Sequence, residues 1–101
     1  MEENVLKLGG NIELSGFSSL DIGAMIILKK IVGNYAKRMS TKSENFEKLC
    51  LTMKMIHNNQ FEINAKMLAN GQAFNSETVD RNLFVAVDNS LKKIMNETGN
   101  I

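Results

Sequence analysis

The sequence has one cysteine, no tryptophan and no apolar run of membrane-spanning length. A single thiol, Cys50, cannot form an intramolecular disulfide, so we expect the chain to work in a reducing compartment. A membrane span needs roughly 18 apolar residues, whereas the longest run here, 24–28, is bracketed by a glycine and two lysines. Acidic Glu2 and Glu3 stand where a secretory signal needs positive charge. These absences predict a cytoplasmic protein with no membrane partner.

The sequence also lacks any recognisable group of catalytic, metal-binding or nucleotide-binding residues. His57 has no second His or Cys near it in the chain, and a zinc site needs three or four converging ligands. Cys50 has no neighbouring His that could activate it as a nucleophile. The glycines match none of the phosphate-binding loops. We therefore predict a protein that is not an enzyme and needs no metal or other cofactor.

Length and charge indicate one ordinary domain over residues 1–101. The apolar fraction is 44% and the charged fraction 23%, as in typical globular proteins. Residues 1–10 are expected to form an N-terminal arm or a short edge strand, and residues 11–98 the core. Twelve basic and eleven acidic residues give a net charge of +1. This balance argues against a broadly cationic coat for nucleic acid, but it leaves room for a local basic patch.

The Asn70-Gly71 pair stands between two alternating segments, which is the strongest short-range signal for a β-hairpin. Before it, apolar residues at every second position of 61–67 predict a strand with one inward face. After it, a more polar strand is expected over 72–78, with Phe74 as its core residue. Asp80 is expected to cap a final helix. The buried stripe of that helix is predicted to contain Phe84, Val87, Leu91 and Ile94.

The first half of the chain predicts a short strand, a long helix and a long strand. Residues 11–15 alternate, and Ser18 followed by Asp21 resembles a capping box that opens a helix. Polar residues 40–43 are expected to end that helix. Its buried stripe is predicted to contain Leu20, Ala24, Ile27, Leu28, Ile31, Tyr35 and Met39. The strand over 46–56 is predicted to turn inward Leu49, Leu51, Met53 and Met55, and residues 57–60 to form a hairpin loop.

The predicted order is therefore β-α-β-β-β-α. Because each strand is apolar on one face only, we expect an α+β two-layer sandwich. In it, two helices cover one face of a four-stranded, mainly antiparallel sheet. The other face is expected to be open. It would carry Glu13, Lys48, Cys50, Thr52, Lys54, Glu62, Asn64 and Lys66.

In this order and in two motifs the chain resembles the hibernation-promoting factors, a family of small ribosome-associated inhibitors of translation. Leu14-Ser15-Gly16 is similar to the Ile-Ser-Gly that ends the family's first strand. Asn70-Gly71 and the segment 84–88, Phe-Val-Ala-Val-Asp, resemble the family's hairpin and its helix start, Tyr-Ala-Ala-Ile-Asp, at matching spacing. The resemblance covers about residues 11–96. It departs at the end of the chain, where family members commonly have a strongly basic tail and this chain reads Asn-Glu-Thr-Gly-Asn-Ile.

The resemblance implies a non-enzymatic protein that binds the small ribosomal subunit, or another structured RNA, through basic residues on exposed helix faces. Such residues neutralise phosphates and release counterions. The candidate RNA-binding residues are Lys30, Lys37, Arg38, Lys42, Arg81, Lys92 and Lys93. The plainer interpretation is that these residues only form the solvent-exposed faces of the helices. Lysines near helix C-termini also interact well with the helix dipole.

Another interpretation is a protein-interaction or self-association module. A homodimer could then form through the open sheet face or through edge strands, whose unpaired backbone groups accept other strands. Ile22 and Ile26, on the outer side of the first helix, could contact a partner or pack on the N-terminal arm. A double-stranded-RNA-binding domain also ends in β-β-β-α. It needs lysines at the start of its last helix, however, and residues 80–84 here read Asp-Arg-Asn-Leu-Phe.

Overall fold

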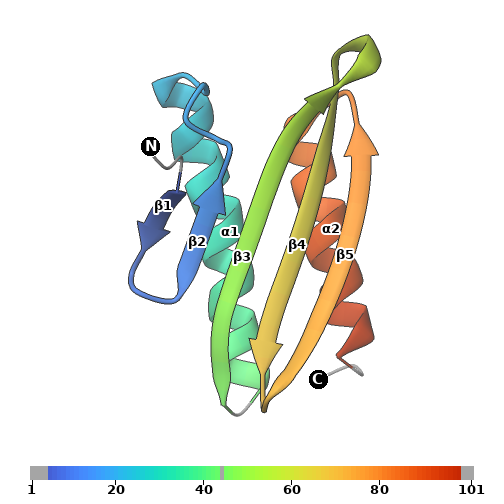
Figure 1. Ribbon diagram of the computed structural model, residues 1–101. Coiled ribbons are helices and arrows are strands. Elements are labelled where there is room, and N and C mark those ends of the chain that lie inside the picture. Colours follow the sequence, from blue (N-terminus) through green and yellow to red (C-terminus); the bar gives the residue numbers. More distant parts are fainter. Residues whose placement is uncertain (1–4, 44, 99–101) are drawn as a thin grey trace.

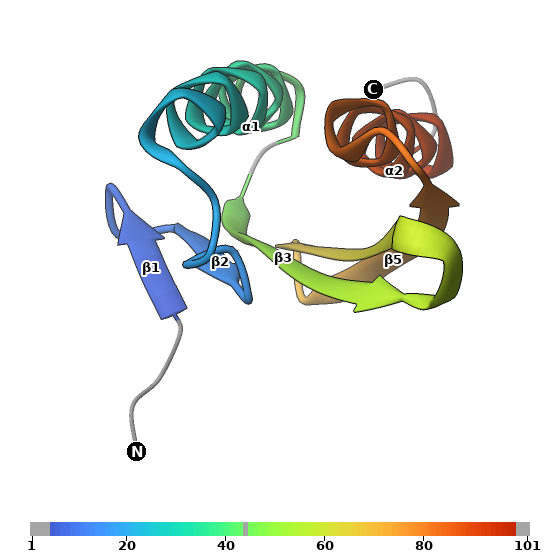
Figure 2. The same cartoon turned by 90° about the horizontal axis from the view of Figure 1, so that it is seen from above.

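The computed structural model describes residues 5–43 and 45–98, which form two layers. One layer is a sheet and the other is a pair of helices that lie side by side on one face of it (Figure 1, Figure 2). The elements in chain order are β1 (Val5–Leu8), β2 (Ile12–Ser15), α1 (Ile22–Lys42), β3 (Phe46–Ile56), the 3₁₀ turn η1 (His57–Asn59), β4 (Gln60–Ala69), β5 (Gln72–Asp80) and α2 (Leu83–Glu97). The predicted α+β sandwich with both helices on one face is confirmed.

The sheet has five strands in the order β1-β2-β3-β4-β5, so the prediction of a four-stranded sheet was wrong. The extra strand is Val5–Leu8, which pairs with β2 in antiparallel register. β3 runs parallel to β2, because the chain crosses back along α1 between the two strands. The sheet is therefore mixed, and only its β3-β4-β5 part is the antiparallel meander that the sequence predicted.

The core lies between the helices and the one apolar face of the sheet. Leu14 of β2 pairs in register with Leu51 of β3, and both side chains are fully buried. Ile63, at an inward position of β4, is also fully buried, as predicted. Phe17 is buried too, yet it lies in the loop before α1, outside any periodic segment, and the pattern did not identify it.

Two residues predicted to be in the core, Ile27 and Met55, are instead 46% and 59% exposed. The two helices run in the same direction (Figure 1), and Tyr35 contacts Asp88 across them. Ile27 lies about two helical turns before Tyr35, whereas α2 begins only five residues before Asp88. No part of α2 therefore lies beside Ile27 to cover it. Met55 pairs with Phe61, which pairs with the last residue of β5, so it also lies beyond the start of α2. In α1 the fully buried set includes Val32, which the prediction omitted.

The N-caps of both helices lie further along the chain than the sequence pattern indicated. Asp21 is itself the N-cap of α1, since its Oδ1 accepts a hydrogen bond from the Ala24 amide at 2.7 Å. In α2 the N-cap is Asn82, not Asp80. Asp80 ends β5 and accepts a hydrogen bond from the Asn82 amide at 2.8 Å. An acceptor lay further along the chain in each case, three residues on in α1 and two in α2, and it serves the first free amides of the helix.

α1 also ends later than predicted, because its polar end remains helical. The hydroxyls of Ser40 and Thr41 donate to the carbonyl oxygen of Lys37, at 3.0 and 2.9 Å. Such back-bonding lets Ser and Thr continue a helix although they are common in loops. The helix ends where the Ser43 amide donates to the carbonyl oxygen of Met39. Lys42 consequently lies in the last turn of α1 rather than in a loop.

The Asn70-Gly71 hairpin is confirmed, with φ values of +54° and +73°. Its closing pair is Ala69 with Gln72, so the loop contains two residues. Asn45, before β3, holds the turn from the side: its Nδ2 donates to Asn70 Oδ1 at 2.7 Å. The β4-β5 turn is therefore fixed against the connection between α1 and β3.

A substitution at Gly16 tests how tightly the connection between β2 and α1 packs on the sheet. Its φ is +83°, and an added Cβ would fall against the carbonyl oxygen of Met53. We expect Gly16→Ala to lower the free energy of unfolding by about 2 kcal/mol or more, through backbone strain and this clash. Gly10→Ala is the matched control, because Gly10 also has a positive φ but no atom lies near its added Cβ. Urea unfolding measures both, and equal losses would contradict the packing argument.

Candidate nucleic-acid interface

α1 carries a strong positive charge with nothing on the helix to balance it. Of its 21 residues five are basic, and none is acidic. The rest of the chain has seven basic and eleven acidic residues, so the positive charge is concentrated on this one element. The basic residues are Lys29, Lys30, Lys37, Arg38 and Lys42.

Lys30 and Lys37 point away from the sheet on the outer face of α1. They are seven residues apart, which is two helical turns, and both are exposed. The core-facing residues Leu28, Tyr35 and Met39 are buried on the opposite side of the helix. The sequence placed Lys30 and Lys37 on one outer face, and the structure confirms this placement.

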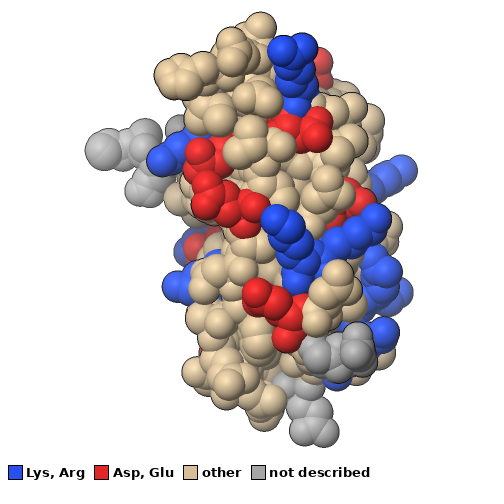
Figure 3. Space-filling model, turned by 90° about the vertical axis from the view of Figure 1, so that its right-hand side faces the viewer, with Lys and Arg blue, Asp and Glu red and all other residues tan. Residues whose placement is uncertain are grey.

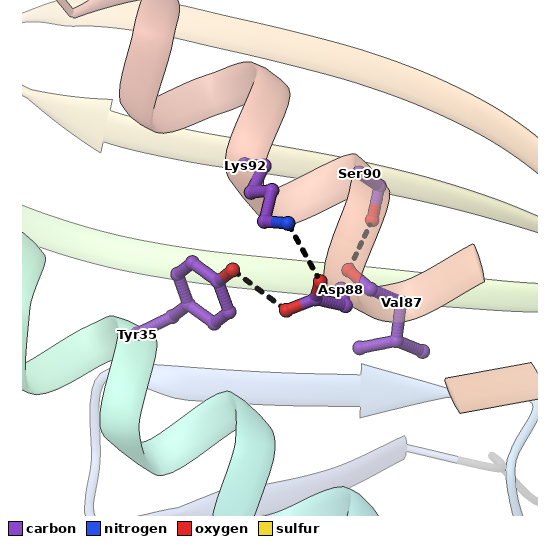
Figure 4. Close-up of polar contacts among 5 residues, drawn as sticks. All are labelled: Tyr35, Val87, Asp88, Ser90 and Lys92. Atoms are coloured by element: carbon purple, nitrogen blue, oxygen red, sulfur yellow. Dashed lines mark hydrogen bonds and ion pairs between the residues drawn. The ribbon is translucent and has the colours of Figure 1, made fainter. Parts of the chain in front are cut away.

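A hydrogen bond between α1 and α2 positions the basic residues Arg38 and Lys92. The Tyr35 hydroxyl donates to Asp88 Oδ1 at 2.7 Å, and the other carboxylate oxygen of Asp88 lies 3.4 Å from Lys92 Nζ (Figure 4). On α1, the guanidinium of Arg38 lies over the Tyr35 ring, 4.4 Å from its centroid. Such cation–π contacts hold an arginine in place while its donors stay available. Arg38 and Lys92, from different helices, are thereby brought to the same junction.

The pKa values at this junction reflect the hydrogen bond. Burial and the hydrogen bond to Asp88 raise the pKa of Tyr35 to about 12. The same hydrogen bond lowers the pKa of Asp88 and outweighs the opposing effect of burial, with Lys92 and Arg38 adding to the decrease. Tyr35 is therefore a neutral donor and Asp88 a charged acceptor throughout the neutral pH range.

Neither Tyr35 nor Asp88 was among the predicted site residues. The spacing of Tyr35 to Arg38 (i, i+3) and of Asp88 to Lys92 (i, i+4) indicates contact on a helix surface. The spacing does not predict the hydrogen bond between Tyr35 and Asp88, which are 53 positions apart in the chain.

The structure does not bring the remaining predicted residues to this junction. Lys93 is on the other flank of α2, where its Nζ donates to the carbonyl oxygen of Glu77 in β5 at 3.3 Å. Arg81 precedes α2, eleven residues before Lys92, which is about 16 Å along a helix axis. It borders a hollow beside Asn58 and Asn59 of η1. Lys42 borders a shallow crevice between the C-terminal ends of the helices.

The distribution of charge follows this arrangement. Figure 3 views the molecule from the side of β5 and α2. In its lower half, Lys and Arg atoms gather along the right-hand margin, where the helices lie. This lower half contains the C-terminal turns of both helices, as Figure 1 shows. The basic residues in the C-terminal halves of the two helices are Lys37, Arg38, Lys42, Lys92 and Lys93.

The open sheet face is mixed in charge rather than basic. Glu13 Oε2 lies 3.0 Å from Lys48 Nζ, and this pairing lowers the pKa of Glu13. Cys50 lies beside them with its Sγ 3.9 Å from Glu13, and burial raises the pKa of its thiol. A thiol with a raised pKa is a poor nucleophile at neutral pH. The open sheet face therefore carries paired charges of both signs.

The described part of the chain shows no candidate metal centre. Within residues 5–43 and 45–98, no three His, Cys, Asp or Glu side chains converge as a metal ion would require. His57 is exposed in the η1 turn. Within the same ranges, neither helix combines the length and the apolar character that crossing a membrane demands.

The arrangement of helices and strands in this chain is shared by solved structures of other proteins. No model of a known protein family and no curated protein matches the sequence. Two solved structures, however, share the fold. A ribosomal subunit interface protein from Coxiella burnetii matches with a TM-score of 0.65 and 13% identity, over 89% of this chain and 92% of its own. The N-terminal domain of Protein Y from Thermus thermophilus matches with a TM-score of 0.65 and 14% identity, over 94% and 98%. At the level of the fold, these matches confirm the resemblance to the hibernation-promoting factors.

Tyr35→Phe tests the bond that joins the helices. We expect it to lower the free energy of unfolding by about 2 kcal/mol at neutral pH, because a hydrogen bond to a charged group is lost while the ring under Arg38 stays. The folded-state pKa of Tyr35 is raised, so the stabilisation is present below pH 10 and is lost as the pH rises towards 12. Chemical unfolding between pH 7 and 12 measures both proteins. A constant difference between them over this range would contradict the assignment.

Proposed function

We propose that this protein is a non-enzymatic, ribosome-associated RNA-binding protein that contacts rRNA phosphates through the outer face of α1. The observation that carries the proposal is the charge of α1, which has five basic residues and no acidic one in a chain of net charge +1. The likeness in fold to two ribosome-associated proteins supports a ribosomal partner. Such a partner would place the protein in the cytoplasm.

The geometry favours recognition of backbone phosphates over recognition of bases. Lys30 and Lys37 are about 10 Å apart along α1, so they can reach different phosphates of one RNA surface. Arg38 and Lys92 are already held at the helix junction by Tyr35 and Asp88, which reduces the ordering cost of binding. The aromatic side chains of the described helices are Tyr35, which is 5% exposed, and Phe84, which is partly buried against the core, so neither presents a fully open ring to a base. We therefore propose that the shape and charge of RNA are read, and not its sequence.

For this proposal we divide the predicted RNA-binding residues into a principal and an outlying group, according to where they lie on the helices. The principal contacts of the proposed surface are Lys30, Lys37, Arg38, Lys42 and Lys92. Lys93 lies on the other flank of α2 and Arg81 precedes this helix, and we propose that both add only to the general electrostatic field. In this proposal binding rests mainly on α1, and we expect it to be strongly dependent on salt.

The test is co-sedimentation with small ribosomal subunits over a series of salt concentrations. The triple variant Lys30→Ala/Lys37→Ala/Lys92→Ala should lower the slope of log affinity against log salt by about 2 to 3, at roughly 0.7–0.9 per lost phosphate contact. Lys7→Ala/Lys54→Ala/Lys66→Ala is the matched control, because it removes the same charge from the sheet side. We expect this control to bind as the wild type does.

Two results would overturn the proposal. The first is a wild-type protein that fails to sediment with the subunit even at low salt. The second is an equal loss in both triple variants, which would show that total charge matters and the α1 face does not.

A second candidate function is self-association through β1. This edge strand exposes two apolar side chains, with Val5 at 44% and Leu6 at 36%. An exposed edge with apolar side chains favours pairing with another strand. Sedimentation velocity distinguishes this candidate, since a strict monomer at high concentration would count against it.

A further inference from the structure

A hollow of about 440 Å³ lies between the outer edge of β5 and the flank of α2. The residues of β5 form one side and those of α2 the other; they are Glu77, Thr78 and Val79, and Asn89, Lys92, Lys93 and Asn96. Figure 3 looks directly onto this side of the molecule. The hollow is separate from the outer face of α1, so an inference about it does not rest on the proposed RNA contact.

The backbone of β5 is free to pair along this edge. β5 is the last strand of the sheet and its ladder is with β4 only. The carbonyl oxygen of Glu77 points outward, because it accepts from Lys93 of α2 and not from β4. In an antiparallel strand the N–H and C=O of a residue point to the same side, and the direction alternates along the chain. Asn75, Glu77 and Val79 therefore all present donor and acceptor groups to the outside.

The two sides of the hollow are held at a fixed separation. The Ser76 hydroxyl donates to the carbonyl oxygen of Ser90, and the Thr78 hydroxyl to that of Ala86, each at 2.7 Å. Ser90 is fully buried, and its own hydroxyl donates to the carbonyl oxygen of Val87 (Figure 4). These bonds fasten α2 to β5 on the core side of the strand. A ligand would therefore enter a preformed groove, which lowers the cost of binding.

We propose that this groove binds an extended peptide with acidic side chains as a sixth strand beside β5. Alternate side chains of such a strand would point to the helix layer and meet the flank of α2. That flank offers the ammonium group of Lys93 and the amides of Asn89 and Asn96, which suit carboxylates. The lining contains two lysines, Lys92 and Lys93, and one acid, Glu77, so its charge favours acidic over basic side chains.

Lys93 then has two roles in succession. In the free protein its ammonium covers the outward carbonyl of Glu77, and a lysine at this place protects an edge strand from unwanted pairing. The contact is exposed and joins a charged donor to a neutral acceptor. A carboxylate forms a stronger, charge-assisted hydrogen bond with the same ammonium. An acidic strand thus draws Lys93 away and frees the Glu77 carbonyl for its own backbone.

Fluorescence anisotropy with a labelled peptide that alternates glutamate and valine tests the proposal. We expect it to bind at least tenfold more tightly than the peptide that alternates lysine and valine. Lys93→Ala should weaken binding of the acidic peptide about tenfold. Lys29→Ala, which removes the same charge from an exposed position on α1, should change it less than twofold. Equal binding of the two peptides, or equal effects of the two variants, would overturn the proposal.

The backbone part is tested separately. Glu77→Pro removes an outward N–H that β4 does not use, so we expect the fold to remain and the affinity for the acidic peptide to fall at least tenfold. On the wild type, NMR should show shifts of the Asn75, Glu77 and Val79 amides when the acidic peptide is added, and this measurement needs no variant. Shifts confined to α1 would refute the groove. Self-association of Lys93→Ala without peptide would assign the edge to a second copy of the chain instead.

Discussion

Only one face of the sheet is apolar, and the rest of the architecture depends on this constraint. Leu14, Leu51 and Ile63 fill that face, while Glu13 and Lys48 form an ion pair on the other. Each helix has one apolar stripe, so both helices have to share the same face and lie next to each other. Their proximity then creates the junction at which Tyr35 and Asp88 meet. The proposed RNA surface follows from the way the core is buried.

The helix layer carries two kinds of surface that differ in charge and in shape. The outer face of α1 is convex and basic, and it suits an extended, negatively charged backbone. The flank of α2 beside β5 forms a groove with an open strand edge, and it suits a chain that can complete a sheet. Lys92 and Lys93 are neighbours in sequence, but one faces the helix junction and the other faces β5. Lys92 also borders the groove, so the two surfaces adjoin along α2.

The corrections to the predicted fold have a common cause. Ile27 and Met55 have the right spacing for core positions, yet α2 begins too late along the sheet to cover them. Val5–Leu8 is too short for its pattern to decide between an arm and an edge strand, and it forms a strand because β2 offers an edge to pair with. Spacing along the chain reports which side chains could face inward. It does not report whether another element arrives to cover them.

The sequence by itself determined the local elements, since strand alternation, helical spacing and the Asn70-Gly71 turn are encoded within a few residues. It also determined that α1 is basic with no acid, and that Lys30 and Lys37 share one outer face. Only the tertiary structure decided the parallel pairing of β2 with β3, the junction of Tyr35 with Asp88, and the separation of Lys92 from Lys93. These features join residues that are far apart in the chain. Their contacts depend on how whole elements pack, which no local pattern contains.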